Sequence, residues 1–201
     1  MSAQGENEAL RRYHSRRRPA RTPEPMGAPP RPGGGRSRFV IQKHAASSLH
    51  YDFRLETDEV LVSWAVPKGP STDPGEKRLA MRTEDHPVEY LDFEGVIPSG
   101  EYGAGQVIVW DTGGYRNLTH RADEEIPMSA GLSQGHLTVW LEGEKLTGGY
   151  ALTRTGRSGE KERWILVKMR DDRADPRRDP VATEPASVRT GRTVEQLADE
   201  G

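Results

Sequence analysis

Short hydrophobic segments, separated by glycine-rich stretches, fill the middle of the chain. Residues 51–56 and 78–82 alternate strictly between apolar and polar positions, as strands with one buried face do. Further segments of strand character are 39–41, 60–66, 106–111, 136–141, 150–154 and 164–168. Glycines expected to form turns between strands are Gly113-Gly114, Gly143, Gly148-Gly149 and Gly156. The pattern predicts a mainly all-β fold of about eight strands, a barrel or a sandwich, with one or two short helices.

The same pattern divides the chain into three parts. Residues 1–38 are rich in Pro, Gly and Arg and predict a flexible basic arm with at most one short helix around 8–18. Residues 39–170 hold all the predicted strands and a helix expected near 126–133. Residues 171–201 form a polar tail that we expect to be disordered.

Charge is distributed unevenly over these parts. The arm carries nine Arg and three Glu, whereas residues 39–170 carry fifteen Lys or Arg and twenty Asp or Glu. A basic arm ahead of an acidic domain suggests a polyanionic partner, although a solvated, disordered arm has the same composition. No apolar run reaches the roughly 18 residues of a membrane span, and no signal peptide is present. The chain has no cysteine, which excludes disulfides, a cysteine nucleophile and cysteine zinc sites, and suggests a reducing cytoplasm.

Candidate chemistry begins on the second predicted strand. His50, Asp52 and Arg54 share one strand face, and His44 ends the preceding strand, where a short loop could bring it beside His50. Two imidazoles and a carboxylate suit a divalent metal with open positions, and the planar guanidinium of Arg54 suits phosphate oxygens. The simpler interpretation is a polar face exposed to solvent, since such spacing also arises by chance.

A second polar cluster follows the strand at 78–82. It contains Glu84 and His86, with Tyr90 four residues further on, while Lys68 ends the strand at 60–66. Each could also be an ordinary surface residue. The glycine-rich stretch 94–105 has neither P-loop nor dinucleotide-binding spacing, so we interpret it as a structural loop. A Gly-x-Ser-x-Gly nucleophile motif is absent from the sequence.

Several blocks of sequence, in order, resemble the 3′-phosphoesterase domain of bacterial DNA ligase D. The blocks are Phe39-Val40-Ile41-Gln42-Lys43-His44, Leu49-His50-Tyr51-Asp52-Phe53-Arg54-Leu55-Glu56, Ser63-Trp64-Ala65-Val66-Pro67-Lys68-Gly69-Pro70, Glu84-Asp85-His86-Pro87, Tyr90, 94–111, Leu152-Thr153-Arg154 and Trp164-Ile165-Leu166-Val167-Lys168. The resemblance covers about residues 9–171. It implies a closed or nearly closed β-barrel that processes DNA 3′ ends during non-homologous end joining. The implied reactions are removal of a terminal 3′-ribonucleoside and then of the 3′-phosphate, leaving a 3′-hydroxyl.

The resemblance also implies roles for individual residues. His44, His50 and Asp52 would bind the metal, usually Mn²⁺, with Co²⁺ or Zn²⁺ as alternatives. Arg54 and His86 would hold the scissile phosphate. Residues implied to support catalysis or substrate binding around them are Lys68, Arg78, Tyr90, Gln42, Glu84, Arg17 and Glu24. Partners implied are DNA 3′ ends, including RNA-tipped ends, and a separate ATP-dependent DNA ligase and Ku.

Two features depart from the family pattern. Arg18 stands where the family has an acidic residue after its arginine, in an arm that contributes to ribonucleoside removal, so phosphate removal is the better preserved step. The sequence also carries no polymerase or ligase domain, and Met1 and the trailing tail favour a free-standing enzyme. Two other functions stay open from the residues alone: a barrel that binds DNA ends without catalysis, and an iron oxygenase with two His and one carboxylate.

Overall fold

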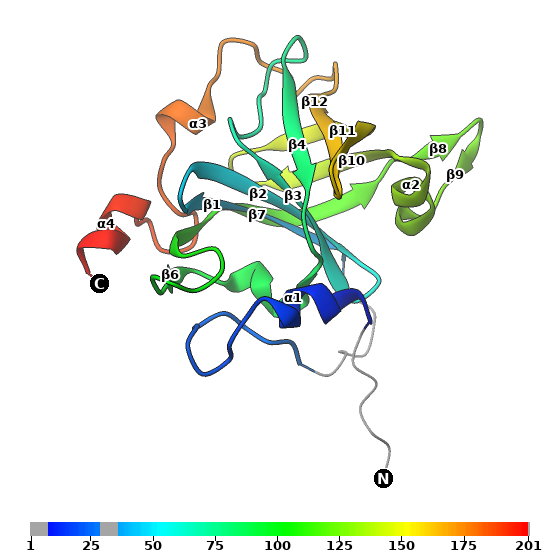
Figure 1. Cartoon of the computed structure of the whole chain (residues 1–201). Helices are drawn as coiled ribbons and strands as arrows, with labels where there is room; N and C mark the ends of the chain where they lie inside the picture. The colour runs from blue at the N-terminus through cyan, green and yellow to red at the C-terminus, as the bar shows by residue number, and fades with distance from the viewer. Residues whose placement is uncertain (1–7, 29–35, 201) are drawn as a thin grey trace.

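The computed structural model describes residues 8–28 and 36–200. Eight of its strands pair side by side in a ring (Figure 1). In ring order they are β1 (Arg38–Ala45), β2 (Leu49–Thr57), β3 (Val60–Val66), β4 (Lys77–Arg82), β12 (Lys161–Lys168), β11 (Thr147–Ser158), β10 (His136–Gly143) and β7 (Gly105–Asn117). Pairing of β7 with β1 closes the ring. The predicted all-β barrel of eight strands is therefore confirmed, and each predicted strand overlaps one of the eight.

Shorter elements decorate the ring. The short strands are β5 (His86–Pro87), which pairs with β3, β6 (Gly95–Ile97), which pairs with β7, and the separate pair β8 (His120–Arg121) and β9 (Glu124–Glu125). The helices are η1 (Glu8–Leu10), α1 (Arg11–Ser15), η2 (Val88–Asp92), α2 (Met128–Gln134), α3 (Pro180–Thr183) and α4 (Val194–Asp199). Helix α2 confirms the helix expected near 126–133. None of the helices in the described parts of the chain is long and apolar enough to cross a membrane.

Alternation along the strands creates two separate hydrophobic clusters. The first fills the inside of the ring and includes Phe53, Trp64, Trp110 and Trp164, all fully buried. The second lies on the outer side of β1, β3 and β7, where Val40, Leu61 and Val109 point away from the ring. Tyr13 from the N-terminal segment and Tyr90 and Phe93 from the η2 region complete this outer cluster. One wall of the barrel is therefore buried on both faces.

The N-terminal segment is ordered where the structure describes it, which corrects the prediction of a flexible arm for residues 8–28. Tyr13 is fully buried, and its hydroxyl donates a hydrogen bond of 2.7 Å to the Pro25 carbonyl. In Figure 1 this segment, with α1, runs along one side of the ring. The short helix expected around 8–18 is confirmed by η1 and α1. Its amphipathic surface packs on the barrel, which composition alone did not reveal. Residues 1–7 and 29–35 of the predicted arm lie outside the described residues.

The C-terminal segment is ordered as well, which corrects the prediction of a disordered tail for residues 171–200. Val181 packs against the inner core, and the Trp110 indole donates a hydrogen bond of 2.8 Å to the Glu184 carbonyl. Val194 and Leu197 of α4 pack on Ile108 of β7. These few apolar contacts anchor a segment whose overall composition is polar.

Several predicted glycine turns lie inside strands instead. Gly113 belongs to β7, and a Cβ atom there would lie 2.1 Å from the Glu142 carbonyl oxygen of β10. Gly148 and Gly156 likewise fall within β11. These glycines allow close approach of backbone or side chains rather than chain reversal.

Candidate metal and phosphate site

The candidate site lies on the outer face of the wall that is buried on both sides. Strands β1 and β2 form a hairpin in which His44 is paired with His50, Gln42 with Asp52 and Val40 with Arg54. Because Phe39, Ile41, Phe53 and their alternating neighbours point into the barrel, the histidines, Asp52 and Arg54 point outward. Asp52 and Arg54 are nevertheless buried, with 5% and 2% of their surface exposed. The simpler interpretation of a solvent-exposed polar face is therefore wrong.

His44, His50 and Asp52 converge at one point. One possible ligand atom from each lies within 4.8 Å of the others, and they form the one such cluster found in the described part of the chain. His44 Nδ1 and His50 Nε2 each lie 3.4 Å from Asp52 Oδ2. The sequence thus correctly predicted that these three side chains would meet.

Backbone carbonyls fix the orientation of both imidazoles. His44 Nε2 lies 2.7 Å from the Gly103 carbonyl, and His50 Nδ1 lies 3.1 Å from the Ser48 carbonyl. A carbonyl only accepts, so these nitrogens carry the hydrogens in the neutral rings. The other two nitrogens then direct lone pairs toward the Asp52 carboxylate. Three electron-pair donors facing one another need a proton or a cation between them, and second nitrogens bonded to carbonyls are typical of metal-binding histidines. The residues therefore fit a divalent metal.

The local charges favour the ionised form of the Asp52 carboxylate, which is the form that binds a cation. Burial raises the pKa of Asp52, but the charge of the Arg54 guanidinium outweighs burial, together with hydrogen bonds from His44 and His50 when their facing nitrogens are protonated. These interactions hold this pKa well below its usual value. Burial lowers the pKa of His50, whereas its hydrogen bond and charge interaction with Asp52 raise that pKa more, so the net shift is upward. Asp52 is thus ionised near neutral pH and ready to bind a cation.

Arg54 connects this cluster to His86. Its guanidinium lies 3.2 Å from Asp52 Oδ2 and donates a hydrogen bond of 2.7 Å to Gln42 Oε1. The Gln42 amide nitrogen donates in turn to the Tyr90 and Phe93 carbonyls, both at 2.9 Å. Gln42 therefore ties Arg54 to the η2 region and fixes the plane of the guanidinium.

His86 is held as a neutral imidazole. Its Nδ1 lies 2.9 Å from the Glu84 carbonyl, and its Nε2 lies 3.4 Å from the Arg17 guanidinium. Arg54 Nη1 also lies 3.1 Å from Nδ1. Burial, followed by the charges of Arg54 and Arg17, lowers the pKa of His86 well below its usual value. Two guanidinium groups around a neutral ring create a positive environment suited to an anion.

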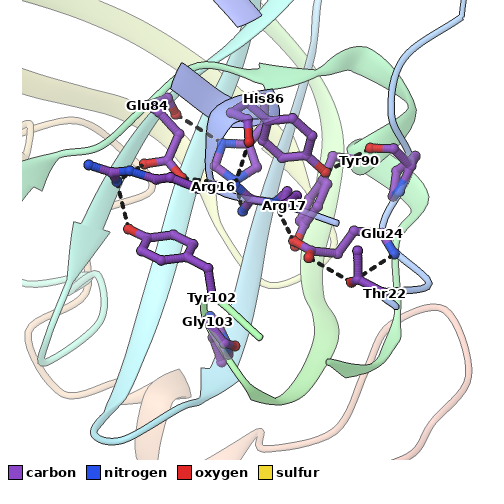
Figure 2. Close-up of polar contacts among 12 residues, drawn as sticks. Arg16, Arg17, Thr22, Glu24, Glu84, His86, Tyr90, Tyr102 and Gly103 are labelled. Carbon is purple, nitrogen blue, oxygen red and sulfur yellow. Dashed lines mark hydrogen bonds and ion pairs between the residues drawn. The ribbon is translucent and has the colours of Figure 1, made fainter. Parts of the chain in front are cut away.

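The N-terminal segment supplies the second guanidinium (Figure 2). Arg17 Nε donates to Glu24 Oε1 at 2.8 Å, and Arg17 Nη1 donates to Glu84 Oε1 at 3.1 Å. The Tyr90 hydroxyl donates to the same Glu24 oxygen at 2.8 Å. The side chains of Arg17, Glu24 and Glu84 are each at most 4% exposed. The segment is thus joined to the site by a buried ionic network.

A glycine-rich loop between β6 and β7 is attached to the same segment. Arg16 donates hydrogen bonds to Glu84 at 3.0 Å and to the Tyr102 hydroxyl at 2.7 Å, and Arg18 pairs with Glu101 at 3.0 Å. Gly103, which follows Tyr102 in this loop, supplies the carbonyl that orients His44. The stretch interpreted from sequence as a structural loop therefore also positions a candidate metal ligand.

Ten of the twelve site residues named from the sequence meet here. They are Arg17, Glu24, Gln42, His44, His50, Asp52, Arg54, Glu84, His86 and Tyr90. Lys68 is exposed in the turn after β3, and Arg78 pairs with Glu76 at 2.5 Å; no contact joins either to the others within the described residues. Sequence reasoning did not anticipate Arg16, Tyr102 and Gly103. An amphipathic helix at 8–15 is the signal that could have indicated docking of the segment.

The fold and site together define a β-barrel with a two-histidine, one-carboxylate cluster beside a group of buried arginines. Comparison with known families agrees with this description. The DNA ligase D 3′-phosphoesterase domain model matches residues 42–154, and the chain belongs to that family.

Three relatives illustrate the relationship. The chain is 49% identical to the multifunctional non-homologous end joining protein LigD of Pseudomonas aeruginosa over 188 residues, which is 92% of this chain and 22% of the relative. It is 46% identical to LigD of Mycolicibacterium smegmatis and 44% identical to LigD of Mycobacterium tuberculosis, each over 82% of this chain and about a fifth of the relative. The chain thus spans about a fifth of the length of these proteins.

Proposed function

We propose that this chain is a metal-dependent phosphoesterase that processes DNA 3′ ends in non-homologous end joining. It removes a 3′-phosphate to leave a 3′-hydroxyl, and it also acts on ends that carry one terminal ribonucleoside. The observation that carries the proposal is the meeting of His44, His50 and Asp52 directly beside Arg54. Family membership and the names of the relatives support the same assignment.

The metal in this proposal is Mn²⁺, with Co²⁺ or Zn²⁺ able to replace it. His44 Nδ1, His50 Nε2 and Asp52 would hold it, because these atoms face one another with free electron pairs. A divalent metal supplies charge that polarises a phosphate oxygen and can lower the pKa of a bound water.

The protein's own groups would hold the phosphate. Arg54 presents fixed positive charge next to the ligand cluster, and phosphoryl transfer depends mainly on such positioning and charge stabilisation. Arg17 lies on the other side of His86 and adds a second buried cation. His86 is a neutral imidazole between the two guanidinium groups, so one of its ring nitrogens can orient a phosphate hydroxyl or a water there.

The acidic groups nearby support the proposed second activity. Glu84 and Glu24 are both engaged by Arg17, at the end of the site away from the metal cluster. A ribose 2′-hydroxyl could donate to such a carboxylate, which gives the site a means of recognising a terminal ribonucleotide. We also propose that the chain works beside an ATP-dependent ligase and Ku, since the relatives are multifunctional end-joining proteins.

The test is release of inorganic phosphate from a DNA primer–template with a 3′-phosphate, with Mn²⁺, Co²⁺, Zn²⁺ or no metal. A parallel substrate carries one 3′-terminal ribonucleotide. His50→Ala and Asp52→Ala should abolish metal-dependent release, whereas His120→Ala, an exposed histidine on β8, should not. No turnover with any metal, together with tight DNA binding, would favour a binding protein. Iron-dependent decarboxylation of 2-oxoglutarate would instead favour an oxygenase.

A further inference from the structure

A large polar groove begins beside the candidate site. Its volume is about 970 Å³, and its lining includes Arg16, Glu84 and Tyr102. Arg16 bonds to both of the others, and Glu84 also binds Arg17 beside His86 (Figure 2). The groove and the proposed phosphate site therefore share the Glu84 carboxylate, and a molecule in the groove would extend directly from the reacting end.

The two walls of the groove come from distant parts of the chain. One wall is α1 of the N-terminal segment, and the opposite wall includes the hairpin that joins β11 to β12. Arg12 of α1 lies 3.8 Å from Glu160 of the hairpin, and both side chains are exposed. An ion pair so exposed stabilises little, so it can yield to a ligand.

The groove carries net positive charge although the barrel domain as a whole is acidic. Seven basic and five acidic side chains line it. Every acidic one is paired with an arginine of the same groove: Glu8 with Arg11, Glu84 with Arg16, Asp85 with Arg82, Glu160 with Arg12 and Glu162 with Arg154. Arg157 and Lys161 are left, both exposed on the hairpin, and no ion pair is found for them within the described residues. Two available cations in a groove whose acidic groups are all paired suit a ligand with repeated negative charges.

We propose that this groove binds the sugar–phosphate backbone of the DNA next to the 3′ end, with Arg157 and Lys161 contacting phosphates. The proposal rests on the proposed function, because it takes the reacting 3′ end to lie at the Arg54 and His86 site. Long cationic side chains on a hairpin suit DNA phosphates because they contact the backbone without requiring a particular base sequence.

The experiment measures DNA binding without turnover. A fluorescent primer–template with a recessed 3′-phosphate is titrated with the full chain in EDTA at salt concentrations between 50 and 200 mM. The Arg157→Ala/Lys161→Ala variant should bind roughly 10-fold or more weakly, and the slope of log affinity against log salt should fall by about 1.4–1.8, as expected for two lost phosphate contacts. Arg157→Glu/Lys161→Glu should weaken binding further.

The matched control removes the same charge elsewhere. Arg173→Ala/Arg177→Ala changes two exposed arginines of the C-terminal segment that are not part of the groove, and both affinity and salt slope should stay as in the wild type. An unchanged salt slope in the Arg157→Ala/Lys161→Ala variant, or an equal fall in the control, overturns the proposal.

Kinetics separate this proposal from the proposed function. With a long primer–template, Arg157→Ala/Lys161→Ala should raise KM and leave kcat unchanged; with a dinucleotide 3′-phosphate, neither constant should change. Equal effects on both substrates would overturn the groove assignment while leaving the phosphoesterase intact. If the salt slope of the wild type exceeds that of the Arg157→Ala/Lys161→Ala variant, but the wild type releases no phosphate with any metal, the groove assignment stands and the proposed function is refuted.

Discussion

The strongest prediction concerns Arg17, which joins the N-terminal segment to the barrel. Its guanidinium is 4% exposed and lies 2.8 Å from Glu24 and 3.1 Å from Glu84. Arg17→Met removes the cation and leaves Glu24 buried and unpaired, whereas Glu84 keeps Arg16. Breaking a buried pair in this way costs about 3–5 kcal/mol, because the remaining charge has lost its partner but not its burial.

This cost should appear as release of the segment rather than as unfolding of the barrel. The ring of strands is closed without residues 8–28, so the segment can detach while the barrel stays folded. Since about 1.4 kcal/mol corresponds to a factor of ten, the equilibrium constant for detachment of the segment should rise by roughly 100-fold to 3,000-fold. Phosphate release should fall with it, because Arg17 leaves the His86 site.

Hydrogen–deuterium exchange of peptides covering residues 8–21 measures the detachment, with β10 and β11 peptides as the internal reference. Adding Glu24→Gln to Arg17→Met removes the buried unpaired charge and keeps an acceptor for the Tyr90 hydroxyl. The double variant should therefore recover about 0.5–3 kcal/mol of the free energy that holds the segment on the barrel. Wild-type protection of residues 8–21 in Arg17→Met would refute the assigned role of the network. So would a double variant that is no better protected than the single one.

Three further predictions follow from local geometry and charge. Gly105→Ala should lower the free energy of unfolding in urea by at least about 2 kcal/mol. The φ of Gly105 is +139°, and a Cβ atom there would lie 1.9 Å from the Ala45 carbonyl oxygen; a variant as stable as the wild type would contradict this. Arg18→Glu should reduce phosphate release roughly fivefold by repelling Glu101, and adding Glu101→Arg should restore it; no restoration would show that the pair has no positioning role. Burial, together with two neighbouring guanidinium groups, lowers the pKa of His86. As the pH drops below about 6.5, His86 is protonated in the unfolded chain but stays neutral in the folded chain, so the free energy of unfolding should fall. The urea midpoint should fall less between pH 7.5 and pH 5.5 in His86→Gln than in the wild type. An equal fall in both proteins would show that His86 does not cause the loss of stability.

The barrel could be predicted from sequence because strand periodicity is local. Tyr51, Phe53 and Leu55 alternate with polar residues, and all three lie in the inner core. The same periodicity placed His50 and Asp52 together on the other face, which is why the meeting of these side chains could be predicted.

What the sequence could not indicate are contacts between segments far apart in the chain. Tyr13 looked like part of a polar arm, yet it packs on His86 with ring centroids 5.0 Å apart. Gly113 looked like a turn, although its role is to let β10 approach β7. Arg78 was named by resemblance alone, and Lys68 also by its place at a strand end; periodicity gives no information on how far a side chain at a strand end reaches. Each of these features depends on the partner that packs against the residue, which a local pattern does not contain.

The N-terminal segment, residues 8–28, also explains how the polar face of β1 and β2 becomes a buried candidate site. On an open face, water would screen the interaction of Arg54 with Asp52, and pairs of exposed charges contribute little. Here Tyr13 and Tyr90 close over the same wall, and Arg54 lies 4.9 Å from the Tyr90 ring centroid. Exclusion of water by itself raises the pKa of Asp52, but it also strengthens the interaction with Arg54, which helps to hold this pKa below its usual value. Burial and the charges of Arg54 and Arg17 together keep His86 neutral. Detachment of residues 8–28 should therefore weaken both metal and phosphate binding even though these residues contribute no metal ligand.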